Sequence, residues 1–277
     1  MTRGLAYAKL NLALVVGPLR ADGKHEVATV IQAIDLHDHV EIEAAATLTV
    51  EGFEDDALVR AGLESIARRA GVDPHWRAHI EKRIPVAAGL GGGSSDAAAA
   101  LRLANALLAE PLPLEALHEL AAALGADVPF FLHEGAQLAT GDGTELTPLQ
   151  LPTDYVVLVV LAEGARKEST AAVYRSFDER SGSDGFDARR GELLRVIGRV
   201  DVPTDLARLP RNDLASSELS EELERLGACR ADVTGAGPAV YGLFDDEPAA
   251  RRAASSLRRV GSTWVTRPVA GGSPPGR

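Results

Sequence analysis

A glycine-rich stretch in the middle of the chain has the residue types of an anion-binding site. Residues 85–96 read Pro-Val-Ala-Ala-Gly-Leu-Gly-Gly-Gly-Ser-Ser-Asp and lead into a row of alanines. Glycines let a ligand approach the backbone closely and alanines favour a helix, so N–H groups and the positive end of a helix dipole should converge here. We expect Ser94 or Ser95 to cap the first turn. A di- or triphosphate suits such a helix start, so the stretch predicts a nucleotide site.

Other interpretations of these glycines are open. A tight strand-to-helix turn built for close packing needs the same small residues. A Walker loop ends in Gly-Lys-Ser/Thr, and no lysine follows these glycines. The dinucleotide-binding fingerprint matches Gly89 and Gly91 but has Ser94 in place of its third glycine. An NAD-dependent oxidoreductase is therefore kept as an alternative function.

Two more places carry polar side chains in apolar surroundings. Lys9 and Asn11 share one face of an apolar predicted strand, so they face water, a partner or a ligand. Asp127 lies between a helix end and an apolar run, and Pro129 is expected to hold Val128 outside helical geometry. A solvated strand edge is the ordinary interpretation of an isolated lysine, and a turn or N-cap that of an isolated aspartate.

The bulk composition limits the function classes. The chain has 277 residues, of which 45% are hydrophobic and 25% charged, which is typical of a globular protein of one large or two ordinary domains. A net charge of -11 argues against a nucleic-acid partner. Cys229 is the only cysteine, so no internal disulfide forms, and no apolar run reaches the roughly 20 residues of a membrane span. We expect a cytoplasmic protein.

The sequence also predicts the elements that must position these residues. Two strands joined by a polar turn at Asp22-Gly23 form an N-terminal hairpin, and a strand over 76–80 leads to the glycines. Apolar periodicity predicts a helix after the glycines and others over 57–70, 114–124, 169–177, 191–200, 212–226 and 247–260. A second glycine loop at 234–238 interrupts a strand. We expect a domain boundary near 151 and a disordered tail over 271–277.

Three of these features together resemble the motifs of the GHMP small-molecule kinases. They are Ala8-Lys9-Leu10-Asn11, the stretch from Pro85 to Ala97, and Thr234-Gly235-Ala236-Gly237-Pro238, in the family's order. Gln32-Ala33-Ile34-Asp35-Leu36 and Gly125-Ala126-Asp127-Val128-Pro129-Phe130-Phe131 narrow the resemblance to the branch that phosphorylates the 2-hydroxyl of 4-diphosphocytidyl-2-C-methyl-D-erythritol, in the non-mevalonate route to isoprenoid precursors. The resemblance implies a two-domain α+β fold with the active site in the cleft between the domains. The N-terminal α/β domain would span 1–151 and carry the phosphate loop; the ferredoxin-like C-terminal domain would span 152–270.

The resemblance also implies roles for individual residues. Asp127 would be the general base, and Lys9 would keep that carboxylate ionised and neutralise charge on the transferred phosphoryl group. ATP would be bound with Mg²⁺, for which Ser95 is the candidate protein ligand. The loop expected to bind ATP consists of Pro85, Val86, Ala87, Ala88, Gly89, Leu90, Gly91, Gly92, Gly93, Ser94 and Ser95.

For the diphosphocytidyl-methylerythritol substrate the resemblance implies a second set of residues. They are Asn11, Lys24, His25, Tyr174, Gly235 and Gly237, with the Tyr174 ring stacked on cytosine. Lys24 stands where the family has a tyrosine, which predicts weaker or altered cytidine binding. Two alternatives stay open: a GHMP kinase for another small alcohol, and a binding protein of this fold without catalysis. The oligomeric expectation is a monomer or a weak homodimer.

Overall fold

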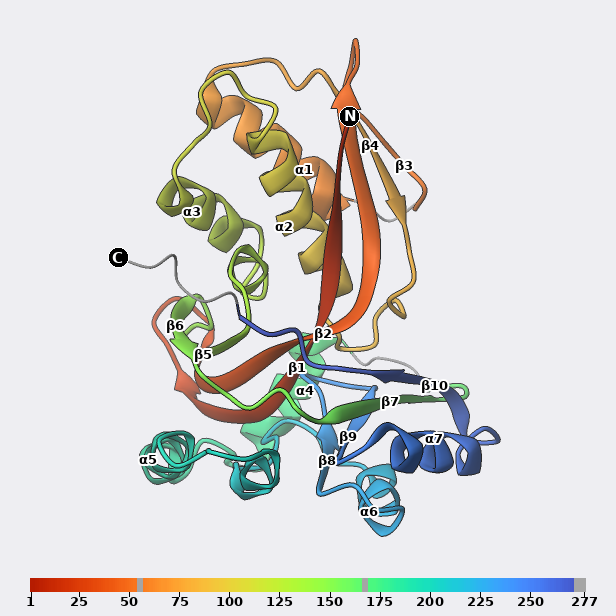
Figure 1. The fold of residues 1–277 in the computed structure, drawn as a ribbon. Helices are drawn as coiled ribbons and strands as arrows, with labels where there is room; N and C mark the ends of the chain where they lie inside the picture. Colours follow the sequence, from red (N-terminus) through yellow and green to blue (C-terminus); the bar gives the residue numbers. More distant parts are fainter. Residues whose placement is uncertain (54–56, 166–168, 272–277) are drawn as a thin grey trace. The chain divides into compact units, whose positions relative to one another are not determined.

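The computed structural model describes residues 1–53, 57–165 and 169–271, and the chain divides into two compact units (Figure 1). Unit 1 comprises residues 1–8, 36–86 and 91–133; unit 2 comprises 9–35, 87–90 and the chain from 134 onwards. Helices and sheets are mixed in both units, as the predicted α+β class requires. The long strands β1 (Thr2–Leu19) and β2 (His25–Ala44) pair with each other and contribute residues to both units, which confirms the predicted N-terminal hairpin.

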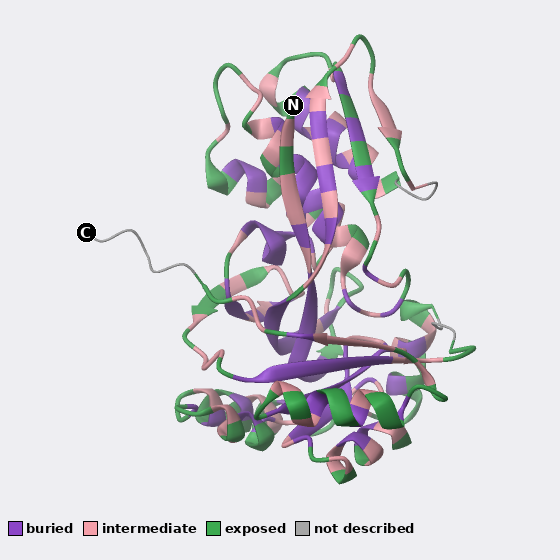
Figure 2. Ribbon diagram, turned by 45° about the vertical axis from the view of Figure 1, so that its right-hand side comes forward, coloured by how far each residue is buried: buried purple, intermediate pink, exposed green. Residues whose placement is uncertain are grey.

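Unit 1 combines a small sheet with helices that pack on one another. β4 (Trp76–Glu81) pairs antiparallel with β2 and parallel with β3 (Thr49–Glu51). Buried and exposed residues alternate along β4, an alternation visible in Figure 2, so one face of this strand covers the core. The helices are α1 (Ala57–Ala70), α2 (Gly92–Asn105), α3 (Leu114–Leu124) and the short 3-10 helix η1 (Pro129–Leu132).

Helix α2 is the central helix of unit 1. Its residues 95–101 are all buried, and five of these seven residues are alanine or leucine. Small side chains let α1, α3 and η1 approach it closely, and all three contact it. The packing of the rest of α2 against these helices therefore holds the start of α2 in place.

Unit 2 holds two sheet regions. β5 (Ala136–Gly141) pairs with β2 and with β6 (Glu145–Leu149). The second sheet has the order β10-β7-β9-β8, with every pair antiparallel. Its strands are β7 (Val156–Ala162), β8 (Arg230–Val233), β9 (Val240–Phe244) and β10 (Gly261–Thr266). The other elements are α4 (Thr170–Glu179), α5 (Phe186–Ile197), η2 (Pro203–Arg208), α6 (Glu218–Arg225) and α7 (Glu247–Ser256).

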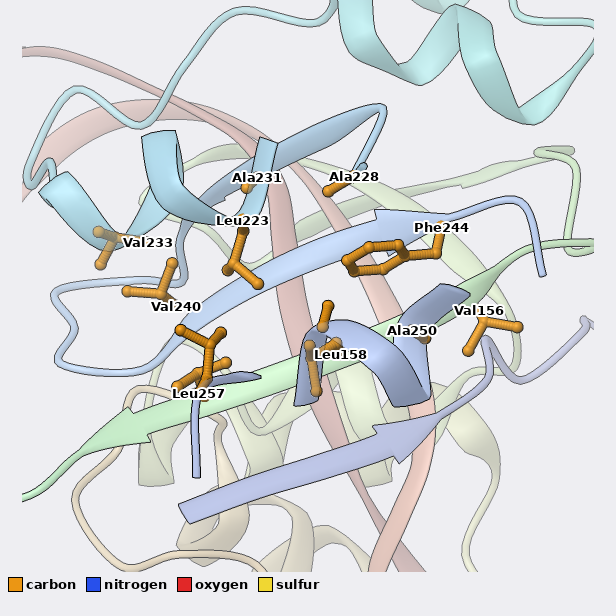
Figure 3. Close-up of a cluster of buried hydrophobic side chains, with 12 residues drawn as sticks. Val156, Leu158, Leu223, Ala228, Ala231, Val233, Val240, Phe244, Ala250 and Leu257 are labelled. Carbon is orange, nitrogen blue, oxygen red and sulfur yellow. The ribbon is translucent and has the colours of Figure 1, made fainter. Parts of the chain in front are cut away.

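The second sheet confirms the expected ferredoxin-like arrangement. Helix α6 precedes β8 and helix α7 precedes β10, which gives a β-α-β-β-α-β order on one antiparallel sheet. Figure 3 shows the core that this creates: Leu223 of α6, Leu257 at the C-cap of α7, Leu158 of β7 and Phe244 of β9 belong to one cluster of buried side chains. Full burial of each such side chain contributes about 1.5–3 kcal/mol. This cluster fixes the strands between which the second glycine loop runs.

The expected start of one helix and the expected backbone geometry before Pro129 are wrong. The helix expected over 212–226 begins only after its N-cap Ser217, because the Asn212 side chain accepts a hydrogen bond from the backbone N–H of Leu214 and holds a turn there. Val128 is helical (φ −63°, ψ −43°), because the turn into η1 outweighs the preference against helical geometry before proline.

Other expectations concern ends and boundaries. The domain boundary near 151 stays a prediction. The expected disordered tail lies, apart from Gly271, outside the described residues. Within the described ranges, no helix combines the length and the apolar run that crossing a membrane requires.

Candidate active site

Three motifs far apart in the sequence meet in unit 2. The Lys9 backbone N–H donates to the carbonyl of Leu90 at 2.9 Å, which ties β1 to the glycine stretch. The Ala239 N–H donates to the carbonyl of Ala88 at 3.0 Å, which ties the second glycine loop to the same segment. Residues 87–90 are thus held between the first and third motifs.

Gly89 shows why the contact between the two loops needs glycine. Its φ is +85°, a region that side chains rarely adopt. A Cβ on Gly89 would lie 2.5 Å from the carbonyl oxygen of Thr234 and 2.9 Å from that of Gly237. Any side chain here would push the two loops apart.

Lys9 has a buried ammonium group beside the contact between residues 87–90 and the second glycine loop. The residue is 3% exposed, and its Nζ donates to Asn11 Oδ1 at 2.6 Å. A Cβ on Gly235 would lie 3.4 Å from Lys9 Nζ, so Gly235 leaves the space that the ammonium occupies. A buried ammonium beside backbone loops is suited to stabilising developing negative charge.

Asn11 links Lys9 to Thr234 of the third motif and to Thr29, a residue that the sequence did not single out. Its Nδ2 donates to Thr29 Oγ1 at 2.8 Å, and its backbone N–H donates to Thr234 Oγ1 at 3.2 Å. The Asn11 side chain is therefore occupied by protein groups on both its ends, and its expected contact with substrate stays a prediction. A hydroxyl in an apolar strand gives no sequence signal that would have identified Thr29.

The helix start differs in detail from the prediction. Helix α2 begins at Gly92, its N-cap is Gly91 in the left-handed region (φ 73°, ψ 14°), and no side chain caps it. Ser94 and Ser95 lie inside the first turn, because the Ser95 N–H already donates to the carbonyl of Gly91 at 2.9 Å. The amides of Gly92, Gly93 and Ser94 precede this first helical bond, which is the geometry in which helix N-termini bind anions.

The predicted phosphate-loop residues differ in accessibility. Val86, Ala87 and Gly93 are exposed, whereas Ala88 and Leu90 are buried. Ser95, the expected metal ligand, is 2% exposed. The remaining loop residues, Pro85, Gly89, Gly91, Gly92 and Ser94, are half-buried.

A cluster of three charged side chains lies at this helix start in unit 1. Lys82 Nζ is 2.5 Å from Asp38 Oδ2 and 2.7 Å from Asp96 Oδ2. A Cβ on Gly92 would lie 3.2 Å from Lys82 Nζ, so the ammonium sits against the first residue of α2. Asp38 also accepts the backbone N–H of Ile84 at 2.8 Å. The cluster therefore connects the turn before the glycines to the helix after them.

The pKa values of this cluster follow from its burial. Burial raises the pKa of Asp96 to about 7, against the opposing effect of Lys82. Burial lowers the pKa of Lys82, but the two carboxylates outweigh it and the net shift is upward. In the sequence Lys82 stands in the charged run Glu81-Lys82-Arg83, which is typical of a solvated surface, so composition gave no sign of this cluster.

Asp127, the expected general base, lies in unit 1. It is half-buried in the turn over 126–128 that follows α3, and the Val128 N–H donates to the carbonyl of Gly125 at 3.1 Å to close this turn. The four residues of η1 that follow are all buried. The backbone that carries the carboxylate is thus anchored on both sides.

His25 and Tyr174, both expected at the diphosphocytidyl substrate, lie together in unit 2. Their rings stack with centroids 4.8 Å apart and an interplanar angle of 27°. His25 Nδ1 lies 2.9 Å from the carbonyl oxygen of Gly17, which only accepts, so Nδ1 carries a proton. His25 Nε2 is 3.4 Å from Asp178 Oδ2. The stacked Tyr174 ring has His25 on one face, and its expected contact with cytosine stays a prediction.

Lys24 is exposed and pairs with Asp142 of the β5–β6 turn at 2.6 Å. Burial works to raise the pKa of Asp142, but hydrogen bonds from Lys24 and Thr144 outweigh it and lower the pKa to about 2. Lys24, at the position where the resemblance implies a tyrosine, therefore has an acidic partner of its own.

Comparison with known proteins agrees with this arrangement. Residues 57–135 match the family model of the GHMP kinases N terminal domain, and residues 208–263 match that of the GHMP kinases C terminal. A 4-diphosphocytidyl-2-C-methyl-D-erythritol kinase of Kineococcus radiotolerans is 40% identical over 278 residues, which cover 91% of this chain and 84% of the relative. The corresponding protein of Rhodococcus jostii is 40% identical over 293 residues, which cover 98% of this chain and 92% of the relative.

Solved structures give the same result. A crystal structure of 4-(cytidine 5'-diphospho)-2C-methyl-D-erythritol kinase has a TM-score of 0.79 at 32% identity and covers 98% of this chain and 100% of that one. A mevalonate kinase at 15% identity and a TM-score of 0.77 shares the fold. The fold and the three motifs define a GHMP kinase. Within that class, the chain belongs to the 4-diphosphocytidyl-2-C-methyl-D-erythritol kinase family.

Proposed function

We propose that this chain transfers the γ-phosphoryl group of ATP to the 2-hydroxyl of 4-diphosphocytidyl-2-C-methyl-D-erythritol. The observation that carries the proposal is the near full-length similarity to kinases of that name. The meeting of residues 9, 87–90 and 234–239 around a buried ammonium supports it, because a phosphoryl-transfer site needs such a cation. Family membership favours this reaction over a NAD-dependent oxidoreductase and over another alcohol as acceptor.

The ATP phosphates are proposed to bind along residues 85–95. The amides at the start of α2 are suited to this, since they precede the first helical hydrogen bond. Small residues in this stretch permit the close approach that a triphosphate needs.

For the chemical step we propose Asp127 as the general base and Lys9 as the cation beside the transferred group. The acceptor is a tertiary alcohol and hence a poor nucleophile, so removal of its proton and neutralisation of the phosphoryl oxygens both lower the barrier. Lys9 is held for such a role by its bond to Asn11.

Mg²⁺ is proposed to accompany ATP. Within the described ranges no group of three His, Cys, Asp or Glu side chains is arranged as a metal site. A Mg²⁺ ion that accompanies a nucleotide is held mainly by phosphate oxygens and water, with one or two protein ligands. Ser95 in the first turn of α2 is the proposed protein ligand. When bound, the ion would neutralise negative charge on the ATP phosphates.

The diphosphocytidyl substrate is proposed to bind against the substrate set inferred from the sequence. Of that set, His25 and Tyr174 already form a stacked aromatic pair, and Gly235 leaves room beside Lys9. The proposed oligomeric state is a monomer or weak homodimer, which light scattering would test.

The experiment that tests the proposed function measures ADP release with ATP, Mg²⁺ and three acceptors: the diphosphocytidyl substrate, mevalonate and homoserine. Turnover is expected with the first only. Asp127→Asn and Lys9→Met should each lower kcat by 100-fold or more, while thermal protection by ATP with Mg²⁺ persists in Asp127→Asn. Thermal protection by NAD but not by ATP would refute the proposal. Full turnover by Asp127→Asn would remove this carboxylate as the base.

Lys24→Tyr tests the departure from the family pattern. The aromatic ring restores a flat stacking surface, so the KM for the diphosphocytidyl substrate should fall by several-fold while kcat changes little. Lys24→Met is the matched control, because it removes the charge and the pairing with Asp142 without adding a ring. An unchanged or raised KM in Lys24→Tyr would place residue 24 outside the substrate site.

A further inference from the structure

Thr29 of β2 is a buried hydroxyl residue whose contacts lead to Lys9. It is 4% exposed, and its Oγ1 lies 2.7 Å from the carbonyl oxygen of Ala13 and 2.8 Å from Asn11 Nδ2. All of these residues belong to unit 2. Thr29 thus does not contact the Lys9 ammonium in these bonds but is linked to it through the side chain of Asn11.

The directions of these hydrogen bonds follow from the chemistry of the groups. A threonine hydroxyl has one proton, and the Ala13 carbonyl only accepts, so Thr29 donates to Ala13. Toward Asn11 the Thr29 oxygen is then an acceptor, which selects the NH₂ end of the Asn11 amide. The other end, Oδ1, consequently faces Lys9 Nζ at 2.6 Å.

The reversed orientation of Asn11 would be unfavourable at both ends. It would place an NH₂ group against the Lys9 ammonium, donor against donor, and the amide oxygen against the acceptor on Thr29. Because the two ends of an amide have nearly the same shape, their hydrogen-bond partners decide between the orientations. Thr234 Oγ1, 3.5 Å from Asn11 Oδ1, is a hydroxyl that rotates to suit either end and so decides little.

We infer that Thr29 is a positioning residue of the kinase site: it fixes the orientation of the Asn11 amide and thereby holds the Lys9 ammonium in place. The inference rests on the proposed role of Lys9 in phosphoryl transfer. Loss of the acceptor at Thr29 removes one of the two contacts that hold the Asn11 amide, and an amide that rotates moves its Oδ1 and with it the Lys9 ammonium out of position.

The test compares Thr29→Val, which keeps the shape and removes the acceptor, with Thr29→Ser, which keeps the hydroxyl. Thr29→Val should lower kcat by about 10- to 100-fold, because displacement of a reacting group by about 1 Å costs this much. The KM values for both substrates should stay within about threefold, and Tm should fall by about 3 °C or less. Thr29→Ser should recover most of kcat.

A double-mutant cycle separates positioning from a general structural effect. The carboxylate of Asn11→Asp has two equivalent oxygens and therefore no orientation to lose. Thr29→Val made on Asn11→Asp should change kcat by less than about threefold. An equal 10- to 100-fold loss of kcat from Thr29→Val in the wild-type and Asn11→Asp backgrounds would overturn the inference but not the proposed function. A Thr29→Val enzyme with the wild-type kcat, together with an inactive Lys9→Met, would do the same. A fully active Lys9→Met would overturn the proposed function and the inference with it.

Discussion

Replacing Lys82 by methionine should destabilise the protein through the two carboxylates that it leaves behind. Asp38 and Asp96 have side chains 0% and 4% exposed, and both contact Lys82. Removing one partner from a buried ion pair costs about 3–5 kcal/mol. At pH 7 we expect a loss in the free energy of unfolding at the lower end of this range, about 3 kcal/mol. The raised pKa lets Asp96 take up a proton when the ammonium is gone, so one of the two carboxylates becomes neutral.

The pH dependence of this loss gives the sharper test. In the wild-type protein the pKa of Asp96 is raised from 3.8 to about 7, so folding binds a proton. The resulting stabilisation is complete below the unfolded value and is lost as the pH rises to about 7. Without Lys82 the folded pKa is higher still, so the loss continues above pH 7. The difference in unfolding free energy between wild type and Lys82→Met should therefore grow from pH 6 to pH 8.5.

Urea unfolding at both pH values measures this difference, and thermal scans should show Tm lowered by about 6–12 °C at pH 7. Arg83→Met is the matched control. The Arg83 side chain, next to Lys82 in the sequence, pairs with Glu81 at the surface, so this substitution should change the free energy of unfolding by about 0.5 kcal/mol or less. Adding Asp96→Asn to Lys82→Met should flatten the pH dependence. A Lys82→Met protein within about 1 kcal/mol of wild type at pH 8.5 would refute the reasoning.

Two further predictions concern the loops of unit 2. Gly89→Ala should cost about 2 kcal/mol or more, because its Cβ would lie 2.5 Å from the Thr234 carbonyl oxygen at a φ of +85°. Gly93→Ala, whose Cβ would meet nothing within 4 Å, is the control, and urea unfolding should find it as stable as wild type or more so. Asp142→Asn should cost about 1 kcal/mol at pH 7 and much less at pH 2, because the pKa lowered to about 2 gives stability that decreases below about pH 4 and is lost as the pH falls through about 2. The free energy of unfolding measured at pH 7 and at pH 2 tests this. An equal difference between Asp142→Asn and wild type at both pH values would contradict the prediction.

Sequence patterns predicted those elements whose signals are local. The bounds of α1 and α3 follow from apolar periodicity and from the glycine after each helix, so both were predicted to the residue. The strand with alternating Trp76, Ala78 and Ile80 is β4. The helix expected over 191–200 instead spans Phe186–Ile197, because Phe186 is buried at its start and the preceding Gly185 is its N-cap.

The site was predictable only in part, for a physical reason. Lys9 and the glycines stand out because a lysine in an apolar strand and four glycines in five residues are rare local compositions. The pairing of Lys82 with Asp38 depends on residues 44 positions apart, and a charged run looks the same whether solvated or buried. Asn212 illustrates the same limit: its side chain donates to the carbonyls of Val233 and Gly235, contacts that replaced the expected helix start.

The interleaving of the two units has a consequence for how the enzyme is made. Residues 87–90 leave the ribosome early, yet the N–H that binds Ala88 belongs to Ala239. Until residue 239 has been synthesised, the glycine segment has its contact with Lys9 but lacks the one with Ala239, so a nascent or truncated chain ending before that point holds residues 87–90 on one side only. Contacts so distant along the chain also slow folding, and a slowly folding chain exposes apolar surface for longer.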